Sequence, residues 1–448
     1  MLKDLPLTAD QMEAIAKELL PEDVVRNKLE LNMNGTVKQT IKNCVTALEE
    51  DPVLKGKIRL NELSEMTDVA GEVPWERNWL TLDDIDRAHI MMRLEEVYGL
   101  SSDKKIDRAI TVVATHNRYH PIRDKLLSLQ WDGEPRLKHA LHHFLGAEET
   151  EMAYEALKLF MLGAICRVFN PGCKFETMLC LVGKKQGTGK STFMRFLAIN
   201  DDWFTDDIKH LDDERIFQKL QGHWICELPE MLAAINARNV EDIKSFLSRQ
   251  RDNYRIPYEK YAKDRPRQCV FAGTSNKKQF LPSDHSGNRR LIPVEVHEEK
   301  AEVHILDDEE ASRAYILQMW AEIMEIYKRG GFSLTLPKHL QKQLSEYQEE
   351  FTPEDFEATD IRNYLSNTDH DYICTMMIFH EALGNPVNEK LAKWQSISIN
   401  EVLGKIPEWE PVSSHRFEHY GIQRAWKRKN TEDGFIPVPE GMEIPFDD

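Results

Sequence analysis

The residues best suited to chemistry in this sequence lie in a glycine-bearing turn between a strand-like and a helix-like segment. An apolar run, residues 178–182, enters the turn, and a helical apolar spacing begins at Phe193. The residues expected to contact a nucleotide are Gly187, Thr188, Gly189, Lys190, Ser191 and Thr192. Glycines let backbone N–H groups approach a phosphate, a lysine here reaches the outer phosphates, and a serine hydroxyl is a ligand for Mg²⁺. The sequence therefore predicts a nucleoside triphosphate site, with ATP and Mg²⁺ as cofactors.

The spacing of this turn departs by one residue from the usual phosphate-binding pattern. That pattern has four residues between its first glycine and the Gly-Lys-Ser, whereas five separate Gly183 from Gly189, and Lys184 stands at the strict glycine position. The inner part, residues 187–191, is intact, so the anion-binding nest is still expected to form. The competing interpretation is a glycine-rich turn with a solvated lysine.

Two further apolar strands end in polar residues that suit phosphate chemistry. The strand that begins at His223 ends in Glu227, which is the first choice to hold Mg²⁺ or to orient the attacking water. Glu230 lies three residues further on, and the sequence leaves open which of the two carboxylates is catalytic. Asn276 follows the apolar segment 268–275, and its amide is expected to contact the γ-phosphate or the water. The competing interpretation is that Asn276 only closes a turn.

Two arginines, Arg289 and Arg290, precede a third apolar segment, residues 291–296. A guanidinium that reaches the γ-phosphate neutralises charge in the transition state, and such an arginine usually comes from a neighbouring subunit. One of the two is expected to play this part and the other to pair with Asp284, and the sequence leaves open which is which. This interpretation implies a homo-oligomer in the form of a ring.

The charge of the chain is unevenly distributed. A net charge of −18 would ordinarily argue against nucleic acid as a partner. Between Lys244 and Arg290, however, basic residues far outnumber acidic ones, and a second basic cluster lies near the C-terminus. The residues expected to contact nucleic acid are Lys260, Lys263, Lys277, Lys278, Arg424 and Arg428. DNA held in a focused channel is therefore the expected partner.

The composition excludes several other classes of protein. The chain has 448 residues, of which 41% are hydrophobic and 30% charged, as in soluble globular proteins of two or three domains. No apolar run approaches the roughly 18 residues that cross a bilayer, and the start lacks a signal-peptide pattern. Seven cysteines without a Cys-x-x-Cys pair indicate reduced thiols and a cytoplasmic location. His142 and His143 lack metal-ligand spacing with other residues, so core or surface roles are expected for them.

In their order and in their residues, these motifs resemble those of the virulence-associated E (VapE/VirE) family. The resemblance covers residues 75–330 and is carried by Arg77-Asn78-Trp79, Asn117-Arg118-Tyr119-His120-Pro121, Trp131-Asp132-Gly133, Pro171-Gly172-Cys173-Lys174-Phe175, Glu227-Leu228-Pro229-Glu230, Arg255-Ile256-Pro257-Tyr258, Gly273-Thr274-Ser275-Asn276 and Gly287-Asn288-Arg289-Arg290. The members of this family are P-loop ATPases of phages and mobile elements, related to superfamily 3 and D5-type helicases in the AAA+ group.

The resemblance implies further features. It implies a β-hairpin over residues 254–267 that drives DNA, with Lys260 and Lys263 as the expected contacts at its tip. Many relatives carry a primase domain in front, and the segment before residue 75 is too short for one. A primase or host replication proteins are therefore expected as partners.

The expected fold is an α/β P-loop core of the AAA+/superfamily 3 type with a helical N-terminal region and a small winged-helix-like C-terminal module. Residues from 8 to about 70 are expected to be helical, with further helices at 82–97, 103–116 and 149–169. The expected domains are a helical N-terminal segment (1–75), a second helical part (76–170), the ATPase core (171–330), the C-terminal module (331–430) and an acidic tail (431–448).

The leading hypothesis for function is an ATP-dependent, oligomeric DNA helicase or translocase that acts in replication of a phage or mobile element. The alternative is a DNA-binding regulator or helicase loader that uses ATP as a switch and unwinds nothing. A small-molecule kinase is disfavoured, because twin arginines follow the Asn276 strand and no acceptor-site signature is present.

Overall fold

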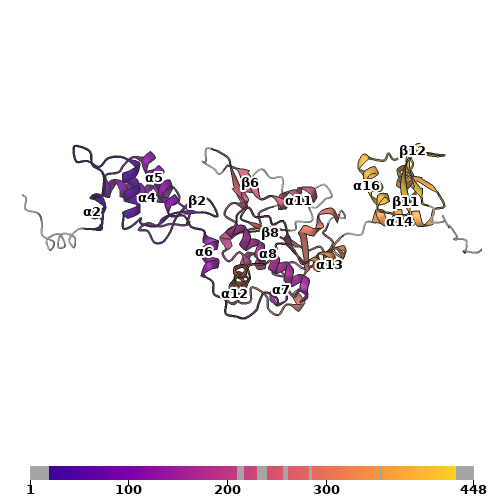
Figure 1. The fold of residues 1–448 in the computed structure, drawn as a ribbon, viewed down its shortest axis with the longest axis horizontal. Helices are drawn as coiled ribbons and strands as arrows, with labels where there is room; N and C mark the ends of the chain where they lie inside the picture. The colour runs from indigo at the N-terminus through magenta and orange to yellow at the C-terminus, as the bar shows by residue number, and fades with distance from the viewer. Residues whose placement is uncertain are drawn as a thin grey trace, which may run out of the picture. The chain divides into compact units, whose positions relative to one another are not determined.

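The computed structural model describes residues 20–208, 216–229, 240–255, 261–281, 285–352 and 356–429. The chain divides into two compact units, Met1–Thr352 and Pro353–Asp448 (Figure 1). Within the described ranges, every helix is too short or too polar to cross a bilayer.

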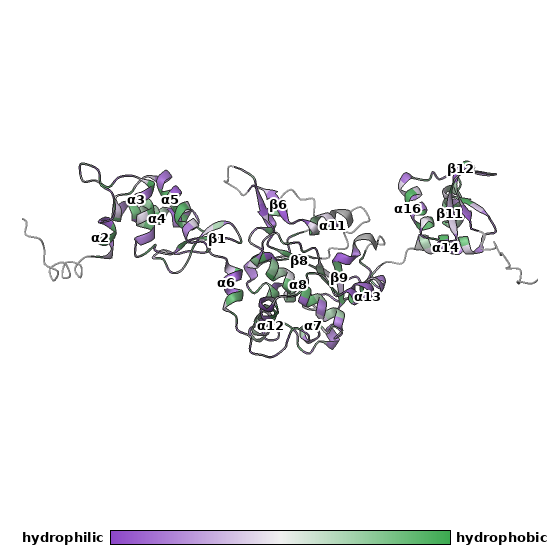
Figure 2. Ribbon diagram, in the orientation of Figure 1, coloured by the Kyte–Doolittle hydropathy of each residue, from purple (hydrophilic) through white to green (hydrophobic). Residues whose placement is uncertain are grey.

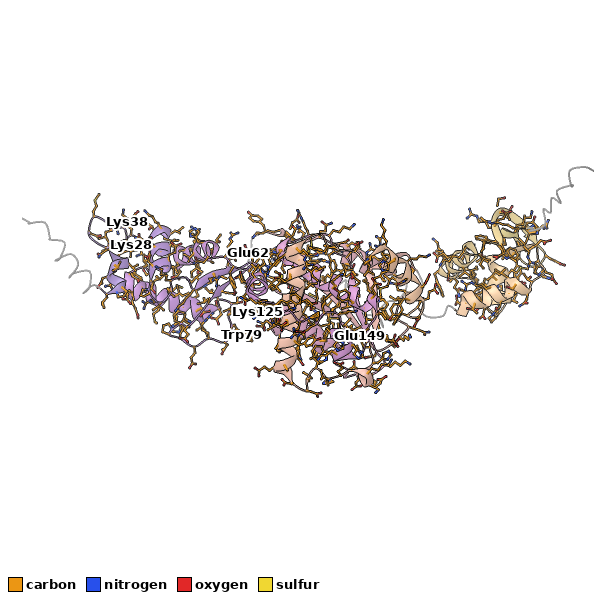
Figure 3. All side chains as sticks on the ribbon, turned by 60° about the horizontal axis from the view of Figure 1, so that its bottom comes forward. Lys28, Lys38, Glu62, Trp79, Lys125 and Glu149 are labelled. Atoms are coloured by element: carbon orange, nitrogen blue, oxygen red, sulfur yellow. The ribbon has the colours of Figure 1, made fainter. Side chains whose placement is uncertain are left out.

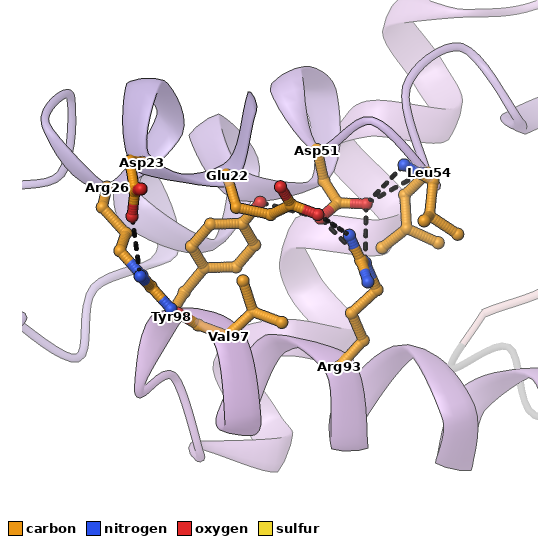
Figure 4. Close-up of polar contacts among 9 residues, drawn as sticks. Glu22, Asp23, Arg26, Asp51, Leu54, Arg93, Val97 and Tyr98 are labelled. Atoms are coloured by element: carbon orange, nitrogen blue, oxygen red, sulfur yellow. Dashed lines mark hydrogen bonds and ion pairs between the residues drawn. The ribbon is translucent and has the colours of Figure 1, made fainter. Parts of the chain in front are cut away.

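The first unit begins with a small bundle of helices. Its elements are α2 (Pro21–Arg26), α3 (Ile41–Glu50), β1 (Ile58–Asn61), β2 (Met66–Val69), α4 (Asp84–Tyr98) and α5 (Asp103–His116). The apolar faces of the helices pack into one cluster, which also buries Ile58. The fully buried carboxylate of Asp51 joins them, because it accepts hydrogen bonds from Nε of Arg93 at 2.9 Å and from the Tyr98 hydroxyl at 2.7 Å (Figure 4). A buried charge held by two donors fixes how these helices meet.

Residues 58–69 form an antiparallel hairpin, so the expectation that 8–70 is helical is wrong for this stretch. Turn chemistry is the physical reason. The side-chain oxygen of Asn61 accepts a hydrogen bond from the Leu63 N–H at 3.0 Å, and Glu65 takes a left-handed φ of 55°. Such side-chain-to-backbone bonds compete with a helix and favour a turn.

The centre of the first unit is a five-stranded parallel sheet covered by helices. Its strands, in the order β4-β5-β8-β3-β9, are β4 (Phe204–Thr205), β5 (Ile225–Leu228), β8 (Val270–Ser275), β3 (Met178–Val182) and β9 (Leu291–Glu295). The helices of this part are α6 (Pro121–Ser128), α7 (Ala140–Leu145), α8 (Glu151–Phe169), α9 (Lys190–Leu197), α10 (Ile216–Leu220), α11 (Val240–Ser248), α12 (Glu309–Arg329) and α13 (Lys338–Glu349). Short 3-10 turns lie at η1 (Asp201–Trp203), η2 (His285–Arg290) and η3 (Glu298–Lys300). This arrangement confirms the α/β class of the core.

Both faces of the sheet are buried. Leu179 and Leu181 of β3 belong to one apolar cluster, together with residues of α8, α9 and α12. Cys180 of the same strand belongs to a second cluster, with residues of α10 and α11. A strand buried on both faces has a continuous apolar sequence, as β3 does. In Figure 2 the buried helix α8 is mostly hydrophobic, whereas the strand β6, which lies outside the sheet, is hydrophilic.

The parallel strands give the sheet two chemically different edges. The carboxyl ends of the five strands meet at one edge, called here the carboxyl edge, and their amino ends meet at the opposite amino edge. β3 and β9 are each five residues long, so the two edges are about 16 Å apart at about 3.3 Å per residue.

A second hairpin leads into the amino end of β8. It consists of β6 (Arg251–Tyr254) and β7 (Lys263–Pro266). Arg265 forms an ion pair with Glu65 at 3.1 Å, and the buried Arg267 forms one with Asp252 at 2.7 Å. These two arginines therefore hold the base of the hairpin in place.

The second unit combines helices with a three-stranded antiparallel sheet. Its elements are α14 (Phe356–Asn367), β10 (Tyr372–Cys374), α15 (Thr375–Met377), the π-helix η4 (Ile378–Ala382), α16 (Lys393–Gly404), β11 (Trp409–Phe417) and β12 (Gly421–Arg428), with the strand order β10-β12-β11. Leu340 and Leu344 of α13 pack in the core of the first unit, which accordingly extends beyond residue 330 to Thr352.

Candidate nucleotide-binding site

The glycine-bearing turn joins the carboxyl end of β3 to α9 at the carboxyl edge. A Cβ atom on Gly183 would lie 2.6 Å from Cγ2 of Val296, so a larger residue does not fit without displacing Val296, the residue that follows β9. Gly187 and Gly189 both have φ of +80°, a conformation that favours glycine. The turn is therefore a tight loop that ends at Lys190, the first residue of α9.

The ammonium group of Lys190 lies inside this loop, and the residue as a whole is 7% exposed. Its Nζ is within hydrogen-bonding distance of Gly183 O (3.2 Å), Lys185 O (3.0 Å), Thr188 Oγ1 (3.1 Å) and Asn276 Oδ1 (3.0 Å). Asn276 directly follows β8, the neighbour of β3 in the sheet. The loop lysine and the amide from the next strand thus lie together at the carboxyl edge.

The carboxyl group of Glu227, on β5, is fully buried beside this loop. Its Oε1 accepts hydrogen bonds from the Ser191 hydroxyl at 2.7 Å and from the Thr274 hydroxyl at 2.5 Å. Its Oε2 is buried and has no hydrogen-bond partner among the described residues. Burial raises the pKa of Glu227 above its ordinary value, and the carboxylate of Asp206 acts in the same direction, while the two hydroxyl donors and Lys190 oppose it.

These oxygens suit a hard divalent cation. Mg²⁺ prefers carboxylate and hydroxyl oxygens as protein ligands, and Ser191 and Glu227 present one of each at the carboxyl edge. Oε2 of Glu227 is a buried acceptor without a donor, which is costly unless a ligand satisfies it. Ligands of open α/β sheets bind at this edge. The donor set therefore fits Mg²⁺ beside a triphosphate.

Two residues of the site were not found from the sequence. Thr274, on β8, orients the Glu227 carboxylate. The pairing of Thr205 with Cys226 places Asp206, the residue after β4, alongside Glu227. In the sequence, both residues could be seen only as polar residues near the ends of apolar runs. That they lie beside Glu227 follows from the strand order, in which β8 and β4 flank β5.

Arg289 and Arg290 lie at the amino edge, in the 3-10 turn that leads into β9. Both approach Glu176, at 3.6 Å and 3.3 Å, and the expected partner Asp284 lies outside the described residues. The side chain of Arg289 is 73% exposed, whereas that of Arg290 is 15% exposed. Because the length of the sheet separates them from Lys190, neither arginine reaches the loop of its own chain.

The lysines expected to contact DNA in the first unit do not form one surface. Lys263 is exposed at the start of β7, in the hairpin that precedes the amino end of β8. Lys277 and Lys278 follow the carboxyl end of β8, which is six residues and therefore about 20 Å long. Lys278 forms ion pairs with Glu295 at 2.9 Å and Glu350 at 3.1 Å, and Lys277 is exposed.

The remaining predicted residues fall into two groups. In the second unit Arg424 is exposed on β12, whereas Arg428 donates a hydrogen bond to the carbonyl oxygen of Thr368 and thereby ties β12 to the end of α14. Glu230 and Lys260 lie outside the described residues.

Comparison with known proteins gives the family to which the chain belongs. A family model described as the virulence-associated protein E-like domain matches residues 126–353, about half of the chain. An apo structure of the NrS-1 C-terminal region is 13% identical, covers 88% of this chain and 100% of its own, and has a TM-score of 0.48. A second such structure is 13% identical, covers 83% and 96%, and has a TM-score of 0.45. A search of curated proteins finds no match. The matched range contains the loop, Glu227, Asn276 and both arginines, and the chain belongs to the virulence-associated protein E-like domain family.

Proposed function

We propose that this chain is an ATPase that hydrolyses ATP at the carboxyl edge of its sheet and uses the energy to move DNA during replication of a phage or another mobile element. The observation that carries the proposal is Oε2 of Glu227, which has no hydrogen-bond partner in the part of the chain that the structure describes. It is buried beside the Ser191 hydroxyl and near the loop that holds Lys190. A buried carboxylate with an open coordination position next to a glycine-bearing loop is what Mg²⁺ and a triphosphate require.

Each residue of the site has a part in binding. Ser191 and Glu227 would hold Mg²⁺, which when bound supplies positive charge that offsets the charge of the phosphate oxygens. Lys190 would exchange its contacts with the loop oxygens for contacts with the outer phosphates. Thr274 keeps the Glu227 carboxylate in one orientation by donating to its Oε1.

Hydrolysis also needs a water molecule held in line with the γ-phosphate. Asn276 directs its Oδ1 toward Lys190, so its amide N–H₂ is the group it would offer to the phosphate or the water.

The position of the arginines supports action between subunits. Arg289 and Arg290 lie at the amino edge, about 16 Å from their own loop by the length of β9. A head-to-tail ring would bring the amino edge of one subunit toward the carboxyl edge of the next, so an arginine could act on the neighbour's ATP. Glu176 holds the pair, and the more exposed Arg289 is the better candidate for this contact.

Contacts with DNA are proposed at two places. The β6–β7 hairpin presents the exposed Arg251 and Lys263 from the amino edge. The second unit has the element order expected of a winged helix, and Arg424 is exposed on β12. Contacts of lysine and arginine with phosphate do not depend on base sequence, which suits a protein that moves along DNA.

The test compares the wild type with Lys190→Ala on forked DNA. We expect the wild type to hydrolyse ATP and displace a strand, and Lys190→Ala to lose both activities while it still binds DNA. If the wild type hydrolyses ATP but displaces no strand at any salt concentration, the chain is an ATP-switched regulator or loader. If it hydrolyses no ATP with Mg²⁺ and single-stranded DNA present, the proposed ATPase activity is wrong.

A further inference from the structure

Three side chains that the nucleotide site does not use converge at α7. His139 and His143 are four residues apart, so they lie on the same side of this helical turn. Glu302 comes from the segment after η3. Its Oε2 lies 3.0 Å from Nε2 of His139 and 2.6 Å from Nδ1 of His143. One ligand atom from each residue lies within 4.8 Å of the other two.

Neighbouring groups orient both imidazoles. Nδ1 of His139 lies 2.6 Å from Oε1 of Glu149, so a proton on Nδ1 leaves Nε2 with its lone pair directed at the cluster. Glu149 is exposed to solvent (Figure 3). The ring of His143 stacks on that of Tyr315 from α12, with centroids 4.8 Å apart and planes 9° apart. A carboxylate behind a ligating histidine is the usual second contact of metal sites.

The backbone also brings the third side chain into place. The N–H groups of Glu302 and Val303 both donate to the carbonyl oxygen of His143, at 3.1 Å and 3.2 Å. A Cβ atom on Gly146 would lie 1.9 Å from the carbonyl oxygen of His297, so the segment after β9 packs directly on the end of α7. The convergence of the three side chains therefore follows from the packing of two backbone segments.

We propose that His139, His143 and Glu302 form a binding site for a transition-metal dication of the Zn²⁺ class, with water in the remaining coordination positions. Two imidazole nitrogens and one carboxylate oxygen are a donor set for Zn²⁺ and its neighbours, whereas Mg²⁺ and Ca²⁺ favour oxygen ligands alone. The side chains of His139 and His143 are 37% and 22% exposed, so an ion has access from solvent.

The site would connect α7 with the nucleotide loop. Two residues beyond Glu302, Nε2 of His304 lies 3.3 Å from the carbonyl oxygen of Gly187. Next to it, Cγ2 of Ile305 would be 3.0 Å from a Cβ atom on Gly189. A metal that ties Glu302 to α7 therefore also holds the segment that packs against the loop.

His142 is not part of this set, because its Nδ1 contacts the carbonyl oxygen of Ala147 at 3.0 Å. The expectation that the His142–His143 pair has no metal-ligand spacing overlooked His139, four residues before His143. Glu302 could not be found from spacing, since it lies 159 residues further along the chain.

The experiment titrates Zn²⁺ into the full-length, nucleotide-free chain after removal of metals, with a chromophoric chelator as competitor. We expect one ion per chain, and a dissociation constant roughly tenfold or more higher in His143→Ala and Glu302→Gln. Co²⁺ in place of Zn²⁺ should give visible absorption in the wild type that His143→Ala loses. Circular dichroism of each variant checks its fold, and Glu302→Gln keeps the size of the side chain.

The matched control is His116→Ala, which breaks a single histidine–carboxylate pair with Glu49 at 2.8 Å and should bind Zn²⁺ as the wild type does. Three results would overturn the proposal. They are no saturable Zn²⁺ binding by the wild type, equal affinity in the wild type and both cluster variants, or an equal loss in the control. In each case the cluster is an ion-paired surface contact only.

Discussion

Replacing Glu227 by Gln tests whether this buried carboxyl group, which we propose as a ligand for Mg²⁺, destabilises the folded chain when it is ionised. Its side chain is fully buried, and among the residues that the structure describes only Oε1 has donors, from Ser191 and Thr274. Burial raises its pKa, and the carboxylate of Asp206 adds to the effect. In the absence of Mg²⁺ and nucleotide, the ionised form is therefore disfavoured in the folded chain, whereas glutamine carries no charge at any pH.

The sign of the pH dependence follows from proton binding. Because the folded pKa of Glu227 lies above the unfolded value of 4.5, the folded chain binds more protons between these two values. The resulting stability is fully present below 4.5 and is lost as the pH rises through the folded pKa. One proton changes the free energy of unfolding by at most about 1.4 kcal/mol per pH unit. Glu227→Gln lacks this dependence, so it gains stability relative to the wild type as the pH rises through that window.

The assay is urea denaturation of metal-free and nucleotide-free protein at a series of pH values, followed by tryptophan fluorescence. Glu176→Gln is the matched control. Burial alone would raise the pKa of Glu176, but the Ser248 hydroxyl and the nearby cations, Arg290 first, outweigh it and lower the pKa. The contribution of Glu176 to the stability of the fold is thus present above pH 4.5 and is lost only as the pH falls below that value. If the wild type and Glu227→Gln differ by the same amount at every pH, or the slope has the opposite sign, the reasoning is refuted.

Three further substitutions probe the loop, the carboxylate and the hairpin. Thr274→Val removes the hydroxyl that donates to Glu227 at 2.5 Å; we expect at least about tenfold slower ATP turnover and a higher Mg²⁺ requirement in steady-state kinetics, because a hydrogen bond to a charged group contributes ~1.5–3 kcal/mol. Gly183→Ala places a Cβ atom 2.6 Å from Val296, so we expect weaker nucleotide binding and a lower thermal midpoint by calorimetry, from overpacking of ~1–3 kcal/mol. Lys263→Glu should weaken binding to single-stranded DNA, measured by anisotropy, and reduce the slope of log affinity against log salt concentration by about one. ATP turnover in the absence of DNA should not change.

Controls separate these effects from general damage. Lys184→Ala changes an exposed residue of the same loop and should leave nucleotide affinity unchanged. Lys28→Glu makes the same charge change in the helical bundle, where Lys28 pairs with Glu50. An equal loss of DNA binding in Lys28→Glu and Lys263→Glu would contradict a role for the hairpin. Unaltered Mg²⁺ dependence in Thr274→Val, or unaltered nucleotide affinity in Gly183→Ala, would contradict the roles assigned to those residues.

The parts of the fold that could be predicted are those in which the local pattern agrees with the tertiary structure. The helix expected at 103–116 is α5, and that at 149–169 is α8 within two residues. The ends of buried parallel strands could be predicted because each apolar run stops at a polar residue. Glu227 lies at the end of β5, Asn276 directly follows β8, and Lys190 ends the loop that follows β3. The parallel sheet brings all three to one edge.

The parts that could not be predicted depend on strand order or on contacts between distant segments. The role of Thr274 needs the knowledge that β8 lies between β3 and β5, which no local pattern contains. One of Arg289 and Arg290 was expected to act on the phosphate of a neighbouring subunit, but only the position of η2 shows that both lie at the amino edge of the sheet. The hairpin at 58–69 was missed because a turn stabilised by Asn61 interrupts what looked like helical spacing.

Mixing two inactive variants tests the central claim most directly, namely that ATP at Lys190 is hydrolysed with an arginine from the adjoining subunit. One variant is Lys190→Ala and the other combines Arg289→Ala with Arg290→Ala. At equal amounts in a head-to-tail ring, roughly a quarter of the interfaces would join an intact lysine to an intact arginine, because each comes from a different subunit. The account predicts that ATP turnover returns on mixing, although neither variant has it alone. A mixture that stays as inactive as its two components would contradict it.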